Sequence, residues 1–257
     1  MARALVGEYQ LCSWQHRIGW LPLNAYYDRL TALILLDHLA QDAVCIDVGA
    51  FQGEITRQML EAAPAGRVLA FEPLPDQAAA LRQRFADYPV EVLELALSDR
   101  TGPSTFNQVL SNPAYSGLIR RTYDRAHERD RQIQVHTARL DELLAERALE
   151  RIDLIKIDVE GGEYGVLSGA LETIHSHRPL ILFEYGRGAS DHYGVSPEQM
   201  WELLQEKCAM QIYLLPSWLR RRRPMARAAF IANFQSGPDY FFVAAPGKRP
   251  APPGTKG

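Results

Sequence analysis

The 257-residue chain has few cysteines and no long apolar run. Its three cysteines, Cys12, Cys45 and Cys208, are too few and too scattered for a disulfide framework or a zinc site. The apolar run 33–36 is far too short to span a bilayer, and no signal peptide is visible. These absences predict a soluble protein of a reducing compartment, with a cytoplasmic location.

The chain also lacks a strong charge of either sign. Its formal net charge is −3, with 28 basic and 31 acidic residues. We therefore expect no general attraction to nucleic acid or to an anionic membrane. Apolar residues make up 47% of the chain, which is enough for a sizeable core. The length suits one elaborated α/β domain, and no internal repeat is present.

The most informative stretch is residues 44–53, which reads Val-Cys-Ile-Asp-Val-Gly-Ala-Phe-Gln-Gly. The apolar start predicts a buried parallel strand, and the residues that follow Gly53 predict a helix. Gly49 and Gly53 permit a tight turn and a close approach of a ligand to the backbone. The helix start offers free N–H groups to an anion. A plain strand–turn–helix that binds nothing is the alternative.

Two nucleotide cofactors compete for this turn. A dinucleotide-binding fold uses Gly-x-Gly-x-x-Gly, whose middle glycine is missing here. Asp47, at the end of the strand, is an unfavourable neighbour for a pyrophosphate but a natural partner for an ammonium group. S-adenosylmethionine carries an amino group, a carboxylate and a ribose but no phosphate, so Asp47 favours that cofactor.

A second acid, Glu72, ends the apolar run that starts at Val68, about one β-α unit further on. A carboxylate about 20 residues past the glycine turn is placed to accept both ribose hydroxyls. Pro73 ends the strand and leaves Glu72 at the rim of the sheet. A solvated charge at a strand end is the alternative.

Residues 90–97 predict a third strand. Ser98 and Asp99 follow it where an adenine would lie, although an ordinary turn explains them equally well. Residues 103–138 then interrupt the β-α rhythm with two short strands and an arginine-rich linker. An insertion at the carboxyl side of a sheet often carries substrate contacts. The candidates for acceptor contacts, or for ordinary surface positions, are Tyr115, Ser116, His127 and His136.

The stretch 152–163 reads Ile-Asp-Leu-Ile-Lys-Ile-Asp-Val-Glu-Gly-Gly-Glu. Strand alternation places Lys156, Asp158 and Glu160 on one side. A lysine inside a parallel sheet is costly unless it is paired, so we interpret Lys156 as the partner of Asp158 or Asp47. Asp158 and Glu160 end their strand at the edge where ligands bind in open α/β sheets. Glu184 ends a further apolar run in the same way.

Four motifs together resemble those of the FkbM family of methyltransferases. They are Ile-Asp-Val-Gly-Ala-x-x-Gly, Phe-Glu-Pro, Ala-Leu-Ser-Asp and Ile-Lys-Ile-Asp-Val-Glu-Gly-x-Glu, in order over residues 44–184. The resemblance implies an α/β, Rossmann-like class I methyltransferase fold. Such a fold has a seven-stranded, mostly parallel sheet with one antiparallel strand near the edge and helices on both faces. It also implies S-adenosylmethionine as cofactor and a hydroxyl acceptor on a sugar, lipid-linked glycan or natural product.

By matching position, the resemblance implies a set of cofactor-binding residues. They are Asp47, Gly49, Ala50 and Gly53 around the methionine part, Glu72 with Pro73 at the ribose, Ser98 and Asp99 near the adenine, and Asp158. Gly162 is smaller than the residue that many relatives carry, which leaves the local pocket shape open.

Methyl transfer is an in-line displacement, and a base near a sugar-like hydroxyl should help it. The candidates for this base are Asp158, Glu160 and Glu184, in that order, because each lies at a strand end. A divalent metal between these carboxylates is conceivable, since oxygen ligands suit magnesium, but we expect none.

The sequence divides into two parts. Residues 1–40 predict a helical cap, or alternatively a lid over the acceptor, and residues 41–245 predict a methyltransferase domain with the insertion 103–138. Residues 246–257 predict a disordered tail. The basic run 220–223 is a solvated face or a contact for an anionic acceptor. Other functions remain open: a nucleic-acid methyltransferase, a nicotinamide oxidoreductase, or a non-catalytic S-adenosylmethionine-binding protein. We expect a small-molecule or glycan acceptor as partner and no nucleic acid.

Overall fold

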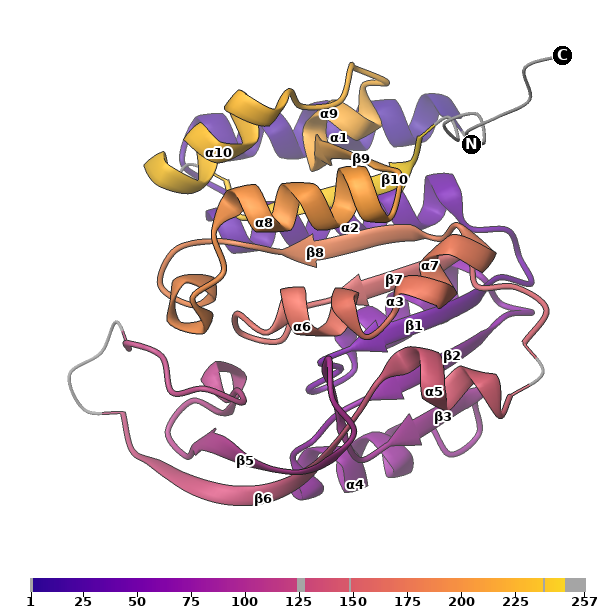
Figure 1. The fold of residues 1–257 in the computed structure, drawn as a ribbon. Helices are drawn as coiled ribbons and strands as arrows, with labels where there is room; N and C mark the ends of the chain where they lie inside the picture. Colours follow the sequence, from indigo (N-terminus) through magenta and orange to yellow (C-terminus); the bar gives the residue numbers. More distant parts are fainter. Residues whose placement is uncertain (1, 124–127, 148, 238, 248–257) are drawn as a thin grey trace, which may run out of the picture.

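A seven-stranded sheet crosses the molecule and carries helices on both faces (Figure 1). The computed structural model describes residues 2–123, 128–147, 149–237 and 239–247. The strand order is β3-β2-β1-β7-β8-β10-β9. These strands are β1 (Val44–Val48), β2 (Arg67–Phe71), β3 (Val90–Leu93), β7 (Leu154–Ile157), β8 (Leu180–Glu184), β9 (Met210–Leu214) and β10 (Phe241–Pro246).

Parallel pairing runs from β3 to β8, whereas β10 pairs antiparallel with both β8 and β9. All residues of β1 and β7 are buried, as expected of parallel strands that helices cover on both faces. The sheet order with its one antiparallel strand confirms the class I methyltransferase fold. Pro246, which we expected in the tail, belongs to β10, and residues 248–257 lie outside the described residues.

The helices form two layers, and alternate strand residues face each of them. One core cluster packs beneath α1 (Ala2–Arg17), α2 (Leu23–His38), α3 (Glu54–Ala62) and α9 (Leu215–Leu219), with α4 (Pro75–Arg84) beside them. The other packs beneath α5 (Leu140–Ala145), α6 (Glu163–Ser168), α7 (Leu171–His177), α8 (Pro197–Trp201), η3 (Glu202–Lys207) and α10 (Arg227–Ser236). In the described part of the chain, no helix is both long and apolar enough to cross a bilayer.

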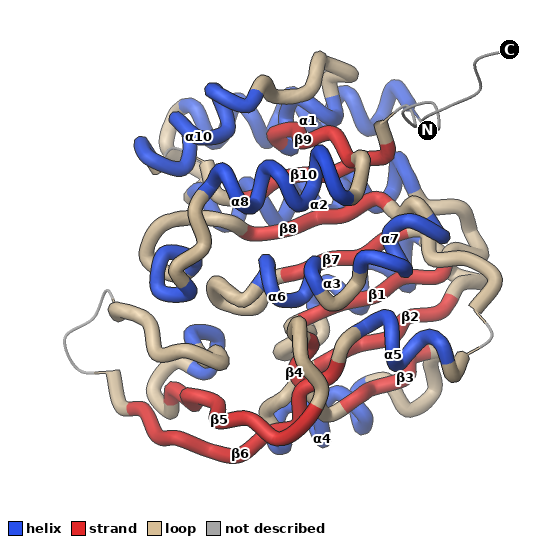
Figure 2. Tube along the Cα trace, viewed as in Figure 1, coloured by secondary structure: helices blue, strands red, loops and turns tan. Residues whose placement is uncertain are grey.

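A second sheet stands at the β3 edge, as the tube in Figure 2 shows. It has the order β4-β6-β5, from β4 (Ala96–Leu97), β5 (Gly102–Val109) and β6 (Asp130–Ala138). The single strand expected over 90–97 is therefore wrong. Pairing with β2 ends at Leu93, and Ala96 pairs instead with Thr137 of β6.

The segment that follows β7 forms two helices, α6 and α7, and not one continuous helix. The break falls at Gly169, where a Cβ would lie 2.1 Å from the carbonyl oxygen of Ser98. A close approach of two backbones, which the residue pattern along 163–175 does not contain, sets the boundary.

Candidate active site

A cavity of about 310 Å³ lies at the carboxyl ends of β1, β2 and β7. Such a volume is typical of small-molecule pockets, and open α/β sheets bind their ligands at this edge. The lining comes from the turn after β1, the end of β2, the loop after β7 and the insertion that contains β5. Within the insertion, η1 (Pro113–Tyr115) contributes Pro113 and Ala114.

The glycine turn forms one wall of this cavity. Gly49 has a φ of 75°, and a Cβ there would lie 2.0 Å from the carbonyl oxygen of Asp158. Only glycine therefore lets the turn pass the end of β7. Gly53 has a φ of 81° and begins α3 against Phe85, but it does not line the cavity.

Glu72 is almost wholly buried at the end of β2 and lines the cavity. Its two carboxylate oxygens each accept one backbone N–H at 2.9 Å, from Leu74 and from Phe51. Burial raises the pKa of Glu72, and the two N–H groups partly oppose that rise. A carboxylate oxygen has two lone pairs, so each retains one for a ligand hydroxyl.

Lys156 lies within the sheet and contacts both the turn after β1 and the carboxylate that follows β7. Its Nζ lies 3.3 Å from Asp47 Oδ1 and 3.8 Å from Asp158 Oδ2, and it donates to the carbonyl oxygen of Gly49 at 2.9 Å. Burial alone would lower the pKa of Lys156, but Asp47 and Asp158 together raise it above its ordinary value. The interpretation of Lys156 as a paired lysine is confirmed.

Asp47 is fully buried and has its partners inside the protein. Its Oδ2 accepts the hydroxyl of Thr56 at 2.6 Å, and Asp47 is not among the described residues that line the cavity. Its contact with a cofactor ammonium group stays a prediction.

The three candidate bases lie in different surroundings. Asp158 lines the cavity with 35% of its side chain exposed. Glu160 also lines it, but its side chain is 15% exposed and forms an ion pair with Arg121. Burial, followed by the charge of Asp158, raises the pKa of Glu160 to about 8 against the opposing effect of Arg121. Burial, again followed by Asp158, raises the pKa of Glu184 well above its ordinary range.

Tyr240 lies between helix α2 and these carboxylates. The Tyr240 hydroxyl donates to the side-chain oxygen of Asn24, and the Tyr240 ring lies 5.0 Å from that of Tyr27. Burial raises the pKa of Tyr240 to about 12, and Glu184 and Asp158 contribute next. The first turns of α2 thus lie near Glu184 and Asp158, while its middle packs into the core through Leu30 and Ile34. The packing fits a helical cap, and the role of residues 1–40 as a lid over the acceptor stays a prediction.

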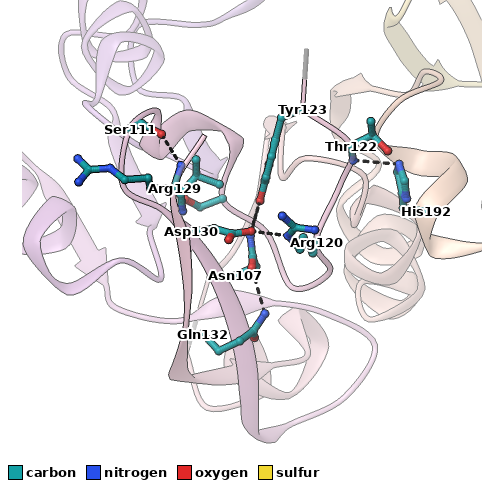
Figure 3. A network of polar contacts seen from close by, with 11 residues as sticks. Asn107, Ser111, Arg120, Thr122, Tyr123, Arg129, Asp130, Gln132 and His192 are labelled. Atoms are coloured by element: carbon teal, nitrogen blue, oxygen red, sulfur yellow. Dashed lines mark hydrogen bonds and ion pairs between the residues drawn. The ribbon is translucent and has the colours of Figure 1, made fainter. Parts of the chain in front are cut away.

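The insertion covers the cavity from the other side and is tied together by polar side chains (Figure 3). Asp130 accepts from Arg120 and Tyr123, and Asn107 donates to the Tyr123 hydroxyl. Thr122 bonds to His192 of η2 (Ser190–Tyr193), so the insertion also contacts the loop after β8.

The four candidates for acceptor contacts in the insertion occupy different positions in the structure. Ser116 lines the cavity, whereas His136 is exposed on β6 and His127 lies outside the described residues. Tyr115 lies beneath the guanidinium of Arg121, at 4.7 Å.

Two residues of the site were missed by the sequence reasoning. Arg121 anchors the insertion to Glu160, and Glu163 is fully buried behind the loop that follows β7. Glu163 Oε1 accepts the N–H groups of Val159 and Gly161 at 3.1 Å each, and burial raises its pKa to about 7. The second glutamate of the Glu-Gly-Gly-Glu motif was a visible signal for Glu163, but Arg121 had none.

The predicted site residues fall into two groups. Those that line the cavity are Gly49, Ala50, Glu72, Pro73, Asp158 and Glu160. Those that do not, among the described residues, are Asp47, Gly53, Ser98, Asp99 and Glu184. Next to Ser98 and Asp99, the wall is formed by Leu95, Ala96 and Leu97. Within the described ranges, no cluster of three or more histidine, cysteine or acidic side chains is arranged to hold a metal.

A family model described as the methyltransferase FkbM domain matches residues 47–210. The chain belongs to the FkbM methyltransferase family. It is 35% identical over 155 residues to the 2-O-methyltransferase NoeI of Sinorhizobium fredii, which covers 56% of this chain and 63% of the relative. It is 29% identical over 175 residues to the hexuronic acid methyltransferase AglP of Haloferax volcanii. This match covers 67% of this chain and 66% of the relative. The chain thus spans less than two thirds of these curated relatives.

Solved structures are similar only in outline. The methyltransferase FkbM from Methylobacillus flagellatus aligns with a TM-score of 0.49 and 14% identity, over 93% of this chain and 58% of that one. The strand order, rather than this likeness, defines the fold.

Methyltransferases of this family use S-adenosylmethionine, and the cavity fits it in three ways. Glu72 keeps lone pairs for ribose hydroxyls, the turn at Gly49 has no side chain to block a ligand, and Leu74, Leu95 and Leu97 form an apolar wall for an adenine.

Lys156→Met should lower the free energy of unfolding by about 3–5 kcal/mol, because it leaves Asp47 buried and unpaired. The double variant Asp47→Asn/Lys156→Met should regain most of that loss. Chemical denaturation measures both. Arg82→Met, which removes an exposed ion pair with Glu94, should cost about 1 kcal/mol or less. A loss below about 1 kcal/mol in the single Lys156 variant would show that the pair is not a structural support.

Glu163→Gln should flatten the dependence of stability on pH. Because the folded-state pKa of Glu163 is raised to about 7, its protonated form favours folding, and this contribution is lost as the pH rises through that value. The melting temperature of the wild type should fall between about pH 5 and about pH 8 more than that of the variant. Exposed Glu206→Gln should keep the wild-type profile; parallel wild-type and Glu163→Gln profiles would contradict the assignment.

Proposed function

We propose that the chain O-methylates a hydroxyl group of a sugar, glycan, glycolipid or natural product. The observation that carries the proposal is the position of Asp158, which lines the cavity, keeps 35% of its side chain exposed and is held by Lys156. Two relatives named as a 2-O-methyltransferase and a hexuronic acid methyltransferase support a hydroxyl-bearing acceptor.

The bound cofactor supplies a methyl group activated by its sulfonium centre. The acceptor hydroxyl must lose a proton as its oxygen forms the new bond, and Asp158 Oδ1 or Oδ2 is the atom that we assign to accept it. Glu160 is a weaker candidate because Arg121 pairs with it. Glu184 is weaker because it does not line the cavity and because burial raises its pKa well above the ordinary value, which favours its protonated form.

The remaining residues of the cavity hold the reactants in place. Glu72 accepts ribose hydroxyls, and the turn at Gly49 and Ala50 surrounds the methionine part. Lys156 fixes Asp158 relative to that turn, since its ammonium contacts both. The insertion and the loop after β7 exclude water from the reacting atoms, which favours displacement over hydrolysis.

Asp158→Asn should lower turnover about 100-fold or more while the affinity for S-adenosylhomocysteine changes little, because the amide keeps the shape but cannot accept the proton. Isotope-labelled methyl transfer into fractionated glycan and metabolite extracts, followed by identification of the product, provides the acceptor for this measurement. Asp87→Asn, an exposed carboxylate outside the cavity, is the matched control. Wild-type turnover in Asp158→Asn would remove Asp158 from the role and make Glu160, which also lines the cavity, the next carboxylate to test.

Glu72→Gln should weaken the binding of S-adenosylhomocysteine about tenfold or more. The amide nitrogen would face the N–H of Leu74 or of Phe51, so one wall of the ribose site loses its acceptor. Calorimetry measures the dissociation constant, and Glu94→Gln, which changes a partly exposed glutamate, serves as control. An unchanged constant in a folded Glu72→Gln protein would exclude Glu72 from the ribose site.

A further inference from the structure

A short segment of the insertion, residues 117–122, lies against the loops that follow β7 and β8. Two of its contacts with them are made by backbone groups. The N–H of Ile119 donates to the hydroxyl of Tyr193 at 3.2 Å. The N–H of Thr122 donates to Nε2 of His192, also at 3.2 Å (Figure 3). These two hydrogen bonds set the course of the segment, and neither of them contains a formal charge.

The third contact of this segment is the ion pair between the Arg121 guanidinium and the Glu160 carboxylate. The two side chains are 13% and 15% exposed, and among the ion pairs of the described residues only Lys156–Asp47 is more buried. The guanidinium also lies 4.7 Å from the ring centre of Tyr115, a favourable position for a planar cation. Desolvation offsets much of what such a buried pair gains from its charges, so its effect is better sought in the geometry that it fixes.

The loop that carries Glu160 has a strained backbone. Glu160 has a φ of 56°, in the left-handed region that residues with a Cβ rarely adopt. Gly161 follows with a φ of 103°, and a Cβ there would lie 2.6 Å from the backbone of the loop after β8. Glu163 holds this loop from behind by accepting the N–H groups of Val159 and Gly161. Strained backbone persists only where its surroundings over-determine it, and Arg121 supplies the contact from the side of the insertion.

Both segments that the ion pair joins line the cavity. Glu160 does so from the loop after β7, and Leu118 does so from the insertion, three positions before Arg121. Leu118 also packs against the cluster that contains Leu74, which belongs to the apolar wall beside Glu72. A ligand that fills the cavity therefore touches side chains of the insertion, whose position depends on the segment that Arg121 holds.

We propose that Arg121 is a positioning residue of the active site, which holds the insertion against the loop after β7 and so keeps in place the wall of the cavity that encloses the cofactor. It acts through Glu160, since Arg121 is not among the described residues that line the cavity. Without the ion pair, the segment keeps the two neutral hydrogen bonds of Ile119 and Thr122, each of which contributes little to stability. The proposal rests on the cofactor of the family and not on the proposed acceptor.

Hydrogen exchange and cofactor binding test the proposal in the full chain. In Arg121→Gln, the amides of residues 117–122 should exchange about tenfold or more faster than in the wild type, while those of β1 and β7 keep their protection. The dissociation constant for S-adenosylhomocysteine should rise about tenfold, because the wall is no longer held in the binding arrangement. Mass spectrometry of the exchanged peptides and calorimetry measure the two effects, and neither measurement needs an acceptor.

Further variants show whether the charge pair is the cause. Arg121→Lys keeps the positive charge and should recover most of the lost affinity, although it gives up the planar contact with Tyr115. If Arg121 acted by packing alone, lysine and glutamine would have similar effects. Glu160→Gln removes the pair from the other side, and the double variant Arg121→Gln/Glu160→Gln should bind within about threefold of the weaker single variant, since both residues act through one contact. Arg129→Gln is the matched control, because Arg129 is exposed in the same insertion and forms no ion pair in the described ranges.

Three results would overturn the proposal. The first is wild-type exchange over residues 117–122 in Arg121→Gln, and the second is faster exchange there with unchanged affinity for S-adenosylhomocysteine. The third is an equal loss of affinity in Arg121→Lys and Arg121→Gln. If Arg121→Gln does not fold, Glu160→Gln carries the same two measurements. Failure to methylate any hydroxyl acceptor, with the exchange and binding results as expected, would instead contradict the proposed function alone.

Discussion

The ammonium group of Lys156 is the contact on which the site depends. It lies between β1 and β7, where it neutralises Asp47 and contacts both the carbonyl oxygen of Gly49 and the carboxylate of Asp158. The glycine turn and the leading candidate base are thus held by one buried charge. Burying such a pair costs desolvation energy that an apolar pair would not, so its retention in the sheet is better explained by positioning than by stability. The same contacts explain why Asp47, a strand-end acid, faces inward and not toward the cavity.

Much of this arrangement follows from local sequence. Apolar runs that end in acids predict buried strands with carboxylates at one edge, and the structure has β1, β2, β7 and β8 there. The pairing of Lys156 also follows, because an unpaired lysine in a parallel sheet is too costly. Other features depend on contacts between distant residues. The carbonyl of Ser98 fixes the break at Gly169, and Arg121 binds Glu160 from 39 positions away. Neither contact can be predicted from the residue pattern of the segments that form it.

The distribution of charge on the surface is another feature that the sequence composition does not predict. A net charge of −3 predicts no general attraction to anions, yet Arg220, Arg222 and Arg223 lie in one exposed turn and form no ion pair within the described ranges. Averaging over the chain hides this distribution, since acids gather at the carboxyl edge of the sheet while these arginines gather in the turn after α9. The fold separates the two, because strand ends and helix surfaces are set by different periodicities. Local charge, rather than its sum, decides which surfaces attract which partners.

The raised pKa values of the carboxylates give the site a further property under the proposed function. Glu160, with a pKa of about 8, and Glu163, with a pKa of about 7, are raised first by burial and then held up in part by Asp158. Positive charge in the cavity favours the ionised form of nearby carboxylates, so a cationic donor bound beside them lowers their pKa values. By linkage, the donor then binds more tightly as the pH rises through the range in which these groups ionise. An acid-rich cavity that is costly without its ligand therefore becomes favourable once a cation enters. This explains how a fold can keep several buried carboxylates in a small volume.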